Sequence, residues 1–522
     1  MNLHCSVFPN LYMDSVSLMQ VSARLAALPG VARASVAMAT PANIERMRDS
    51  GLAVELAAKP SDLLVAWMGE DAQAEAVLQD VRMWLAPVDS PAGESQAARV
   101  PSSLEMALEA QPDANLALIS VPGPYAAAEA LKALRLGLNV MLFSDNVPES
   151  QEAVVKRYAS EHDLLVMGPD CGTAIVGGMP LGFANRVRPG AIGLVAASGT
   201  GLQELTCGIH HLGEGVSQAL GTGGRDLHEE IGGLSMCQGV AMLAQDPATR
   251  LIVLLSKPPA PSVARRVLQQ ARDCGKPVVV HFLGADAAQL EAQGFTAGRS
   301  LRHTAEAAVA ALRGRAVPAQ AAPDAGRLAQ ALAAVARMAR SQTDLRGVFA
   351  GGTFCYEAQL ALLARGLACE SNAPAPGAQA LRSRARGHGH CLLDMGDDEF
   401  TQGRPHPMID PTQRDARLTQ DADDPAAAVV LFDVVLGYGA SAEPLAGLLP
   451  LLAAAQARAA AEGRQVLFVA HVCGTELDPQ PRDACIAALR AAGVLVADSN
   501  MEAAQLAVEA VHAARTRNRE PA

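Results

Sequence analysis

A glycine turn that carries hydroxyl groups lies between an apolar run and a helix-like segment at residues 190–205. The stretch reads GAIGLVAASGTGLQEL and contains Ser198, Gly199, Thr200 and Gly201. A helix begins with backbone N–H groups that lack partners inside the helix, and its dipole makes this end positive. Glycines let an anion approach, and hydroxyls add donors. The turn therefore predicts a phosphate site, although Ser198 or Thr200 would also serve as an ordinary helix cap.

The same pattern of strand, glycine turn and helix recurs at residues 346–360, which read RGVFAGGTFCYEAQL. The turn here holds Gly351, Gly352 and Thr353. Three later pairs of segments match in the same order: TRLIVLLSKPPAPS with AAVVLFDVVLGYGAS, GKPVVVHFLGADA with GRQVLFVAHVCGTE, and EAQGFTAGRSLRHTAEAAVAAL with RAAGVLVADSNMEAAQLAVEAV. We interpret this repetition as a domain duplication. If the two copies face each other, their helix N-termini converge on one anion, which favours a phosphate site over two separate caps.

The densest group of polar residues lies at 394–411, in DMGDDEFTQGRPHPMIDP, among prolines that would fix a loop. The Arg404 guanidinium can bind a substrate carboxylate, and His406 can transfer protons near neutral pH. We therefore consider Arg404 and His406 candidate catalytic residues and Asp410 a candidate substrate ligand. The alternative is that this stretch forms a contact between subunits or a rigid cover.

Three more charged candidates follow predicted strands. Arg225 comes after the glycine turn of GTGGRDL and can hold a carboxylate or phosphate with two hydrogen bonds, so it is the third candidate catalytic residue. Lys257, in SKPP, would offset phosphate charge, and Asp170, in GPDCGT, is a candidate substrate ligand. Arg225 can equally belong to a solvated loop pair, and Lys257 to the surface.

No metal site is predicted. The two histidines of GHGH, at 387–390, lack a third ligand, and the ten cysteines are scattered singly without a CxxC pair. Such cysteine usage is typical of reduced thiols in a cytoplasmic protein.

Length and charge exclude several classes of protein. A chain of 522 residues is too long for one core, so three or four domains are expected. The net charge of −12 and the lack of a basic stripe argue against a nucleic-acid surface. No signal peptide is visible, and Asp433 interrupts the longest apolar run, AAAVVLFDVVLGYGAS. We therefore expect a cytoplasmic protein without membrane or nucleic-acid partners.

Short strands alternate with helices along most of the chain. Stretches rich in Pro, Gly, Ser or charge interrupt the pattern at 86–103, 313–325 and 365–390. Residues 1–85 predict a small α+β domain. From 104 to 312, apolar strands alternate with helices, which predicts parallel sheets that bind ligands at the carboxyl ends of their strands.

Five segments occur in the order found in the α subunit of succinyl-CoA synthetase, which the chain resembles: LISVPGPYAAAEAL, GLNVMLFSDNVP, LLVMGPDCGT, GAIGLVAASGTGLQEL and GTGGRDL. The second copy resembles the matching domain of the β subunit; in that enzyme each subunit aims one helix N-terminus at a phosphohistidine. The resemblance implies an α/β fold with a Rossmann-like CoA-binding-type domain at 104–188. Two flavodoxin-like ligase-CoA-type domains would follow at 189–312 and 326–512, the second with an inserted loop at 365–425.

A closer resemblance covers nearly the whole chain. The segments DSVSLMQVSARL, ATPAN, GGRDL, SKPP and GRPHPMIDP are similar to the FdrA family. That family is commonly described as acyl-CoA synthetases. Members in allantoin-degradation clusters are implied to be one subunit of an oxamate carbamoyltransferase, which converts oxalurate and phosphate into oxamate and carbamoyl phosphate. The resemblance therefore implies other subunits of such an enzyme as partners.

Departures from the synthetase decide which activity we expect. There, a loop ending in His-Ala-Gly carries the phosphorylated histidine; here that loop is absent after PVVVHFLG, and neither His281 nor His303 takes its place. The glycine-rich CoA loop is also missing. We therefore expect a carbamoyltransferase subunit that uses phosphate or carbamoyl phosphate and requires no further cofactor, with CoA binding left open. The alternatives are an acyl-CoA synthetase subunit and a non-catalytic assembly subunit.

Overall fold

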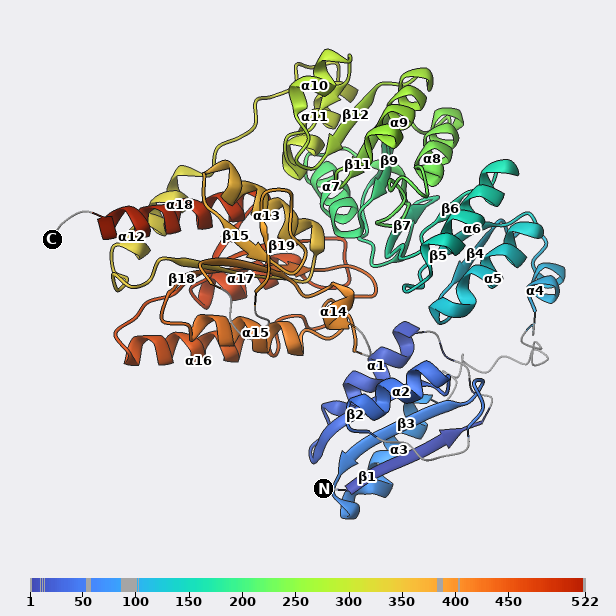
Figure 1. Ribbon diagram of the computed structural model, residues 1–522, viewed down its shortest axis with the longest axis horizontal. Helices are drawn as coiled ribbons and strands as arrows, with labels where there is room; N and C mark the ends of the chain where they lie inside the picture. Colours follow the sequence, from blue (N-terminus) through green and yellow to red (C-terminus); the bar gives the residue numbers. More distant parts are fainter. Residues whose placement is uncertain are drawn as a thin grey trace.

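The computed structural model describes residues 2–9, 11, 13, 15–52, 58–85, 101, 103–382, 388–401 and 404–519. Within these residues the chain forms four β-sheets with helices packed against them (Figure 1). The fold is α/β with a small α+β unit at the N-terminus, as the sequence predicts. None of the described helices is both long enough and apolar enough to span a bilayer.

The N-terminal unit is an antiparallel sheet covered on both faces. Its strands are β1 (Asn2–Phe8), β2 (Val31–Met38) and β3 (Leu63–Gly69), in the order β1-β3-β2. Its helices are α1 (Ser15–Ala26), α2 (Pro41–Asp49), η1 (Asp71–Gln73) and α3 (Ala74–Leu85). Successive side chains of a strand point to opposite faces. Val65 and Trp67 of β3 therefore pack with α1 and α3, whereas Leu64 and Ala66 pack on the side of α2.

A small parallel sheet follows. Its strands, in spatial order, are β4 (Leu116–Ile119), β5 (Asn139–Leu142) and β6 (Val166–Met167). Its helices are α4 (Leu104–Ala110), α5 (Gly123–Arg135) and α6 (Glu149–Glu161). The buried face of α5 consists largely of small side chains, among them Ala126, Ala130 and Ala133, which let this helix lie close to the sheet.

The third sheet has the order β13-β12-β11-β9-β10-β7-β8. Its strands are β7 (Thr173–Val176), β8 (Met179–Gly182), β9 (Pro189–Ala197), β10 (Val216–Gly221), β11 (Leu251–Ser256), β12 (Val278–Phe282) and β13 (Thr296–Ala297). Its helices are α7 (Gly199–His211), α8 (Leu234–Gln245), α9 (Pro261–Asp273), α10 (Ala287–Ala292) and α11 (Leu301–Leu312). The strands from β9 to β13 are parallel, and the β7–β8 hairpin adds to them through antiparallel pairing with β10.

The fourth sheet is parallel and has the order β16-β15-β17-β14-β18-β19-β20. Its strands are β14 (Asp344–Phe349), β15 (Cys369–Ser371), β16 (Gln379–Ala380), β17 (His390–Asp394), β18 (Ala427–Val435), β19 (Leu467–Cys473) and β20 (Leu495–Ala497). Its helices are α12 (Ala325–Val335), α13 (Gly352–Ala364), α14 (Asp398–Thr401), α15 (Thr412–Ala422), α16 (Leu448–Ala461), α17 (Arg482–Ala491) and α18 (Asn500–Arg519).

The stretch 365–425 is not an inserted loop, contrary to the sequence-based prediction. It contains β15, β16, β17, α14 and α15, and β17 pairs with β14 in the centre of the sheet. The order β20-β19-β18-β14-β17 therefore repeats the order β13-β12-β11-β9-β10 of the preceding sheet. The sequence hides β17 because HCLLD is short and lies between a Gly- and His-rich stretch and an acidic one.

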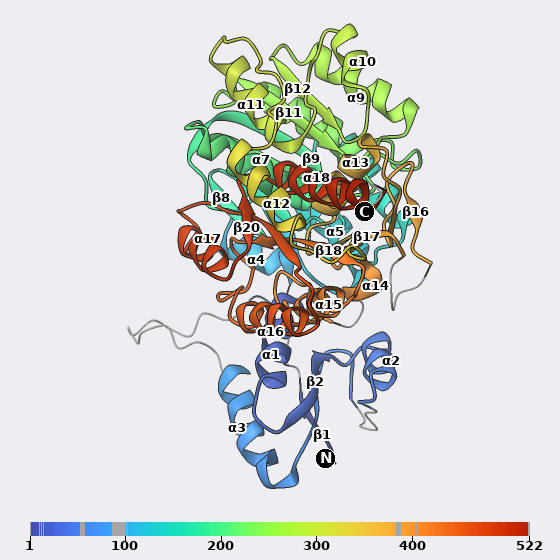
Figure 2. The same ribbon diagram turned by 90° about the vertical axis from the view of Figure 1, so that its left-hand side faces the viewer.

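Helices from both copies pack together between the third and fourth sheets (Figures 1 and 2). Helix α7 lies against α11 and α13, and α13 lies against α18. One hydrophobic core joins these helices, with Leu202 and Ile209 from α7, Phe354 and Leu362 from α13, and Leu506 from α18. Because β9 and β14 lead directly into α7 and α13, this packing brings the first turns of the two helices together.

Candidate functional site

The two glycine turns meet between the third and fourth sheets. Strand β9 ends at Ala197 and α7 begins at Gly199, with Ser198 as its cap: the Ser198 hydroxyl accepts a hydrogen bond from the N–H of Gly201 (3.1 Å). The hydroxyl oxygens of Ser198 and Thr353 lie 2.5 Å apart, so a hydrogen bond joins the first turn of α7 to that of α13. The two helix N-termini thus face each other, which meets the condition that the sequence left open.

Close packing explains why glycines occupy these turns. A Cβ atom on Gly201 would lie 2.6 Å from Leu255 Cδ2 and 3.1 Å from Thr353 Cγ2. A Cβ atom on Gly351 would lie 3.0 Å from the Thr200 hydroxyl oxygen. Each position therefore borders the opposite turn too closely for a larger side chain.

Gly201→Ala is expected to lower the free energy of unfolding by about 1–3 kcal/mol, the usual cost of an extra methyl group in a packed interior. Gly199→Ala is the matched control, because its Cβ would approach only Thr173 Oγ1, at 3.5 Å. Urea unfolding measures both. Equal stability of the two variants would contradict the close approach of the turns.

A buried carboxylate holds the start of α13. Asp433, in β18, accepts hydrogen bonds from the N–H groups of Ala350 (2.7 Å) and Gly351 (2.8 Å) and is fully buried. Burial raises the pKa of this carboxyl, and Arg414 and the two N–H groups act against that shift. Asp433 was not a candidate site residue, although a single acidic residue in AAVVLFDVV is a signal for such a role. It positions the turn of the second copy.

Lys257 and Asp394 bring opposite charges to the start of α13, beside the two glycine turns. Lys257 follows β11, and its Nζ lies 5.9 Å from the ring centroid of Tyr356 in α13. Asp394 ends β17, and its Oδ2 would lie 2.3 Å from a Cβ atom on Gly352. Burial raises the pKa of Asp394 to about 6, and Lys257 acts to lower it. A cation of the first copy and a carboxylate of the second thus lie beside the paired turns.

Arg225 is anchored by buried charges. Its Nη2 lies 3.0 Å from Glu152 and donates a hydrogen bond to the carbonyl of Val147 (2.8 Å). Glu152 lies 2.9 Å from the Nζ of Lys156, which is also 2.9 Å from Asp226. Glu152, Lys156 and Asp226 are each at most 1% exposed. These contacts join α6 to the turn after β10 and fix the position of Arg225.

Asp170 and Arg225 belong to a second charged group. Desolvation by the surrounding chain, and then the carboxylates of Asp145 and Asp398, raise the pKa of Asp170 to about 7, although the residue keeps an exposed surface. Arg225 and Lys257 act to lower this pKa. Among the described residues, no group of three His, Cys, Asp or Glu side chains is arranged to hold a metal ion.

The candidates of the polar stretch 394–411 are Arg404, His406 and Asp410. The structure does not bring all three side chains to the glycine turns. Arg404 is exposed, and none of the described residues forms an ion pair or hydrogen bond with its guanidinium. Asp410 accepts hydrogen bonds from the N–H (3.1 Å) and hydroxyl (2.6 Å) of Thr412, where α15 begins. His406 packs against Phe183, with ring centroids 5.6 Å apart.

The pKa of His406 differs from the near-neutral value that is expected from the sequence. Burial lowers its pKa to about 4, so the imidazole is neutral at pH 7 instead of titrating near it. Its Nδ1 accepts a hydrogen bond from the N–H of Met408 (3.2 Å), and its Nε2 borders Gly396, next to Asp394. Sequence alone does not show this burial, because Phe183 lies far away along the chain.

The paired turns thus contain every candidate phosphate ligand. These residues are Ser198, Gly199, Thr200, Gly201, Gly351, Gly352 and Thr353. Lys257 lies beside them, and Arg225 and Asp170 form the neighbouring charged group. No hydrogen bond or ion pair among the described residues links the side chain of Arg404 or Asp410 with the turns. The roles of all these residues stay predictions.

A buried polar layer lies one helical turn beyond the glycine turns. Glu204 of α7 pairs with His471 of β19, with 2.8 Å between Oε2 and Nε2. Glu357 of α13 accepts hydrogen bonds from the N–H of Leu301 (2.9 Å) and the side chain of Asn500 (2.8 Å), at the starts of α11 and α18. Glu204 and Glu357 occupy equivalent places, four residues after the threonine of each turn, so the layer joins the two copies through their repeated helices.

Glu204→Gln is expected to destabilise the protein most in mildly acidic buffer, because the lowered pKa of Glu204 keeps its carboxylate ionised there and the pair is lost only at still lower pH. Burial favours a neutral His471, but the Glu204 carboxylate outweighs it and raises the pKa of His471. A raised pKa gives stability that is complete below the unfolded value, about 6.5, and is lost as pH rises through the folded value. We expect a loss of about 3–5 kcal/mol near about pH 6, and a smaller loss in alkaline buffer. Urea unfolding over a pH series measures it, and a loss independent of pH would contradict the ion pair.

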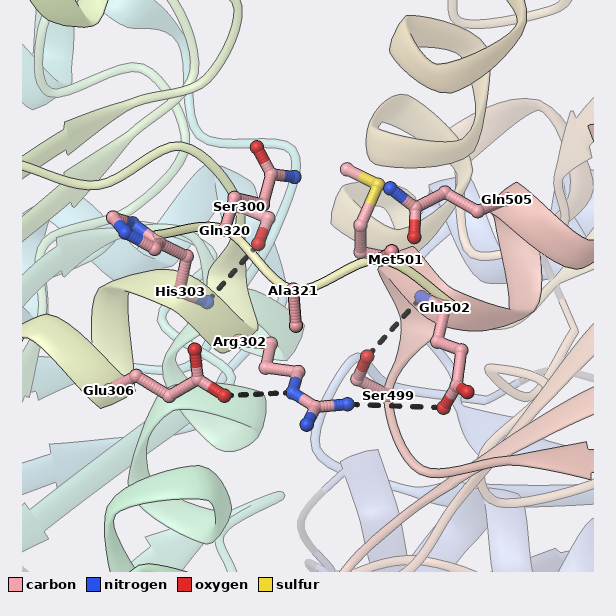
Figure 3. Close-up of a pocket in the computed structure, with 11 residues that line it drawn as sticks. Ser300, Arg302, His303, Glu306, Gln320, Ala321, Ser499, Met501, Glu502 and Gln505 are labelled. Atoms are coloured by element: carbon pink, nitrogen blue, oxygen red, sulfur yellow. Dashed lines mark hydrogen bonds and ion pairs between the residues drawn. The ribbon is translucent and has the colours of Figure 1, made fainter. Parts of the chain in front are cut away.

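A small pocket beside the starts of α11 and α18 contains none of the candidate site residues (Figure 3). Its charges are already paired: the Nε of Arg302 is 2.9 Å from Glu306, and its Nη1 is 3.9 Å from Glu502. Ser300 caps α11 by accepting a hydrogen bond from the N–H of His303 (3.1 Å). We therefore assign no ligand to this pocket.

Three family models match the chain. The model described as CoA-ligase matches residues 348–510, the CoA binding domain matches 187–284, and the model described as AllF, heavy metal-associated domain, matches 1–101. The CoA-binding match falls on the unit that contains β9 and α7, whereas the sequence-based interpretation assigned a CoA-binding-type domain to 104–188. The matches and the parallel sheets together indicate an α/β protein with a CoA-ligase-like scaffold.

Full-length similarity then identifies the family. The chain is 44% identical over 515 residues to the uncharacterized protein YahF of Escherichia coli, and the match covers 98% of each chain. It therefore belongs to the same family as YahF, a family with a succinyl-CoA synthetase-like scaffold, which fits the FdrA resemblance.

CoA ligases are similar over a shorter part. The α subunit of succinate–CoA ligase of Aquifex aeolicus is 30% identical over 183 residues, and that of malate–CoA ligase of Methylorubrum extorquens 28% over 185. Each match covers 33% of this chain, and 58% and 60% of the respective subunit. The chain thus spans less than two thirds of either ligase subunit.

The similarity of this chain to solved structures is low in both fold superposition and sequence identity. An acetyl-coenzyme A synthetase of Ca. Korarchaeum cryptofilum, in complex with phosphate and ADP, has a TM-score of 0.32 and 13% identity and covers 77% of this chain and 83% of its own. ATP citrate lyase of Methanothrix soehngenii, in complex with citrate and coenzyme A, has a TM-score of 0.35 and 20% identity and covers 44% and 45%. Similarity at this level carries no argument about the site.

The description of the N-terminal family raises the question of a heavy-metal site there. Soft metal ions are bound by several sulfur ligands. Cys5 is the only cysteine in residues 1–101, and the Nε2 of the neighbouring His4 lies 3.4 Å from Asp71. Residues 1–101 therefore do not supply the pair of thiolates that a cysteine-based heavy-metal site needs.

Proposed function

We propose that this chain is an FdrA-type subunit of a carbamoyltransferase that uses phosphate. In the proposed reaction, oxalurate and phosphate give oxamate and carbamoyl phosphate, a step of allantoin and purine nitrogen degradation in the cytoplasm. The observation that carries the proposal is the hydrogen bond between Ser198 and Thr353, which holds two helix N-termini against each other. Two such ends supply free N–H groups and dipoles of the sign that a phosphate dianion needs.

The surroundings of His281 and His303, the two histidines nearest in sequence to the missing loop, support a reaction in which neither is phosphorylated. His281 lies buried within β12, and burial lowers its pKa to about 4. The Nε2 of His303 lies 3.0 Å from the carbonyl oxygen of Pro318. Neither histidine presents a free imidazole to the paired turns, so the turns are better suited to phosphate itself.

Catalysis in this proposal is mainly electrostatic. Phosphate attacks the carbamoyl carbon while the two helix N-termini and Lys257 offset its charge. Arg225, fixed by Glu152, holds the carboxylate that oxalurate and oxamate share. No nucleotide is consumed and no cofactor is required. Other subunits complete the enzyme, which is a hetero-oligomer.

An acyl-CoA ligase subunit is the second candidate function. The CoA-ligase and CoA-binding matches favour it, because they cover the two copies that form the paired turns. In that case the turns would hold an acyl phosphate, and the chain would need ATP and CoA for turnover.

The experiment that separates these functions uses the chain together with candidate subunits from neighbouring genes. Oxamate and carbamoyl phosphate are supplied without ATP or CoA, and both phosphate release and oxalurate formation are followed, with a blank lacking oxamate to correct for hydrolysis. Oxalurate formation supports the carbamoyltransferase. Activity only with ATP, CoA and a carboxylic acid overturns it in favour of the ligase. If Thr353→Val and Lys257→Met leave the activity intact while omission of the chain abolishes assembly, the chain is an assembly subunit.

A further inference from the structure

Asp394 is a buried carboxylate that has no role in the reaction as described above. It is 6% exposed, and its backbone is held by two hydrogen bonds with the side chain of Asn372 (2.9 and 3.0 Å). Its Oδ1 accepts a hydrogen bond from the N–H of Gly396 (3.0 Å). Its Oδ2 has no hydrogen-bond partner among the described residues and lies against the first turn of α13, at Gly352. One oxygen is thus fixed, and the other is open to a ligand at the paired turns.

Titratable groups surround Asp394 on several elements. Burial has the largest effect on its pKa, and Asp397 and Asp433 raise the pKa further, to about 6. Lys257 acts in the opposite direction. His406 borders Asp394 across a glycine, and burial keeps this imidazole neutral.

Helix α13 contributes three more titratable groups, the thiol of Cys355, the phenol of Tyr356 and the carboxyl of Glu357, and burial raises the pKa of each. Burial raises the pKa of Cys355 well above its usual value, so this group is neutral. Asp394, with a pKa of about 6, is the carboxyl group that lies against the first turn of α13.

The proposed reaction moves one proton. A bond forms between a phosphate oxygen and the carbamoyl carbon, and the bond from that carbon to the amide nitrogen of oxamate breaks. Oxalurate and HPO₄²⁻ together carry the same atoms and charge as oxamate and the carbamoyl phosphate dianion. The proton that phosphate loses must reach the departing nitrogen, because an amide anion is a poor leaving group. A positioned acid–base group makes this transfer efficient.

We propose that Asp394 is this proton carrier. Its Oδ2 accepts the proton of the attacking phosphate hydroxyl and releases it to the nitrogen of oxamate as the carbon–nitrogen bond breaks. The carboxylate is regenerated, so no further reactant is needed. Before substrate binds, the positive end of α13 stabilises the carboxylate. This inference rests on the proposed function and names the acid–base residue of the same site.

Asp394→Asn tests it in the assembled enzyme, because asparagine can keep the hydrogen bond to Gly396 while losing the ionisable oxygen. We expect kcat to fall about 10²-fold or more. The KM for phosphate should stay unchanged or fall, because a negative charge is removed from beside the phosphate. The carboxylate form is the active one, so wild-type kcat should decrease as pH drops through about 6, whereas the residual activity of the variant should not.

The matched control is Asp423→Asn, which changes an exposed carboxylate 2.9 Å from Arg458. It should keep the wild-type kcat and KM. Calorimetric titration with inorganic phosphate supplies a second readout, in which Asp394→Asn binds at least as tightly as wild type.

Each other outcome overturns a defined part of the argument. Wild-type carbamoyl transfer with an equal kcat in Asp394→Asn removes Asp394 as proton carrier but leaves the proposed function. Joint loss of kcat and phosphate binding in Asp394→Asn shows that its role is structural. Absence of carbamoyl transfer by the assembled wild-type enzyme overturns the proposed function, and this inference with it.

Discussion

Lys257→Met is expected to reduce carbamoyl transfer by the assembled enzyme about 10²-fold or more, comparable to the loss of one preorganised donor at a charged transition state. Methionine nearly preserves the volume of the side chain but removes its charge. Lys257 comes from the first copy and lies over Tyr356 of the second. Its loss therefore removes the cation from between the copies, and phosphate binding should weaken as well, which calorimetry measures.

The same substitution should shift the pH dependence of the residual activity. Lys257 acts to lower the pKa of Asp394, which burial raises to about 6. Without the cation, this pKa rises further, so the acid limb of the rate profile should move to higher pH. Lys132→Met, on α5 at a surface pair with Glu129 (2.6 Å), is the control and should change neither quantity. Wild-type kcat and phosphate affinity in Lys257→Met would exclude Lys257 from the site.

Features carried by short stretches of sequence were accessible without a structure. The two glycine turns, each with a threonine and a glutamate four residues later, indicated the duplication. The contact between Thr353 and Ser198 is visible only in the structure. Continuous apolar strands such as LIVLLS, at 251–256, indicated parallel sheets buried on both faces. Strand β17 escaped because it is short and its neighbours in sequence resemble a loop, although it fills the place that β10 holds in the first copy.

Features that depend on partners distant in sequence were not accessible. Asp433 binds the turn that begins 82 residues earlier, and Lys156 contacts Asp226, 70 residues later. The low pKa of His406 results from burial, which no local motif encodes. Conversely, Arg404 has the chemistry of a carboxylate ligand, yet it lies exposed because charge alone does not specify where a loop folds.

Lys156→Met is expected to lower the free energy of unfolding by about 3–5 kcal/mol, the usual cost of removing one partner of a buried charge cluster. The Nζ of Lys156 donates hydrogen bonds to the Thr222 carbonyl (2.8 Å) and Asp226 (2.9 Å) and pairs with Glu152 (2.9 Å). Methionine fills most of the space but leaves two carboxylates in the interior without this cation. Because Glu152 also fixes Arg225, the position of that guanidinium should be disturbed too.

Urea unfolding of Lys156→Met and of Lys132→Met compares the loss of a buried lysine with the loss of an exposed one. The difference between the two variants measures the effect of burial. The exposed Lys132 pair should contribute only about 0–1 kcal/mol. Adding Glu152→Gln and Asp226→Asn to Lys156→Met should recover part of the stability, because the cost arises from uncompensated charge and such neighbours are not additive. Equal effects of the two lysine substitutions, or a further loss in the triple variant, would contradict a charge cluster that binds α6 to the turn of Arg225.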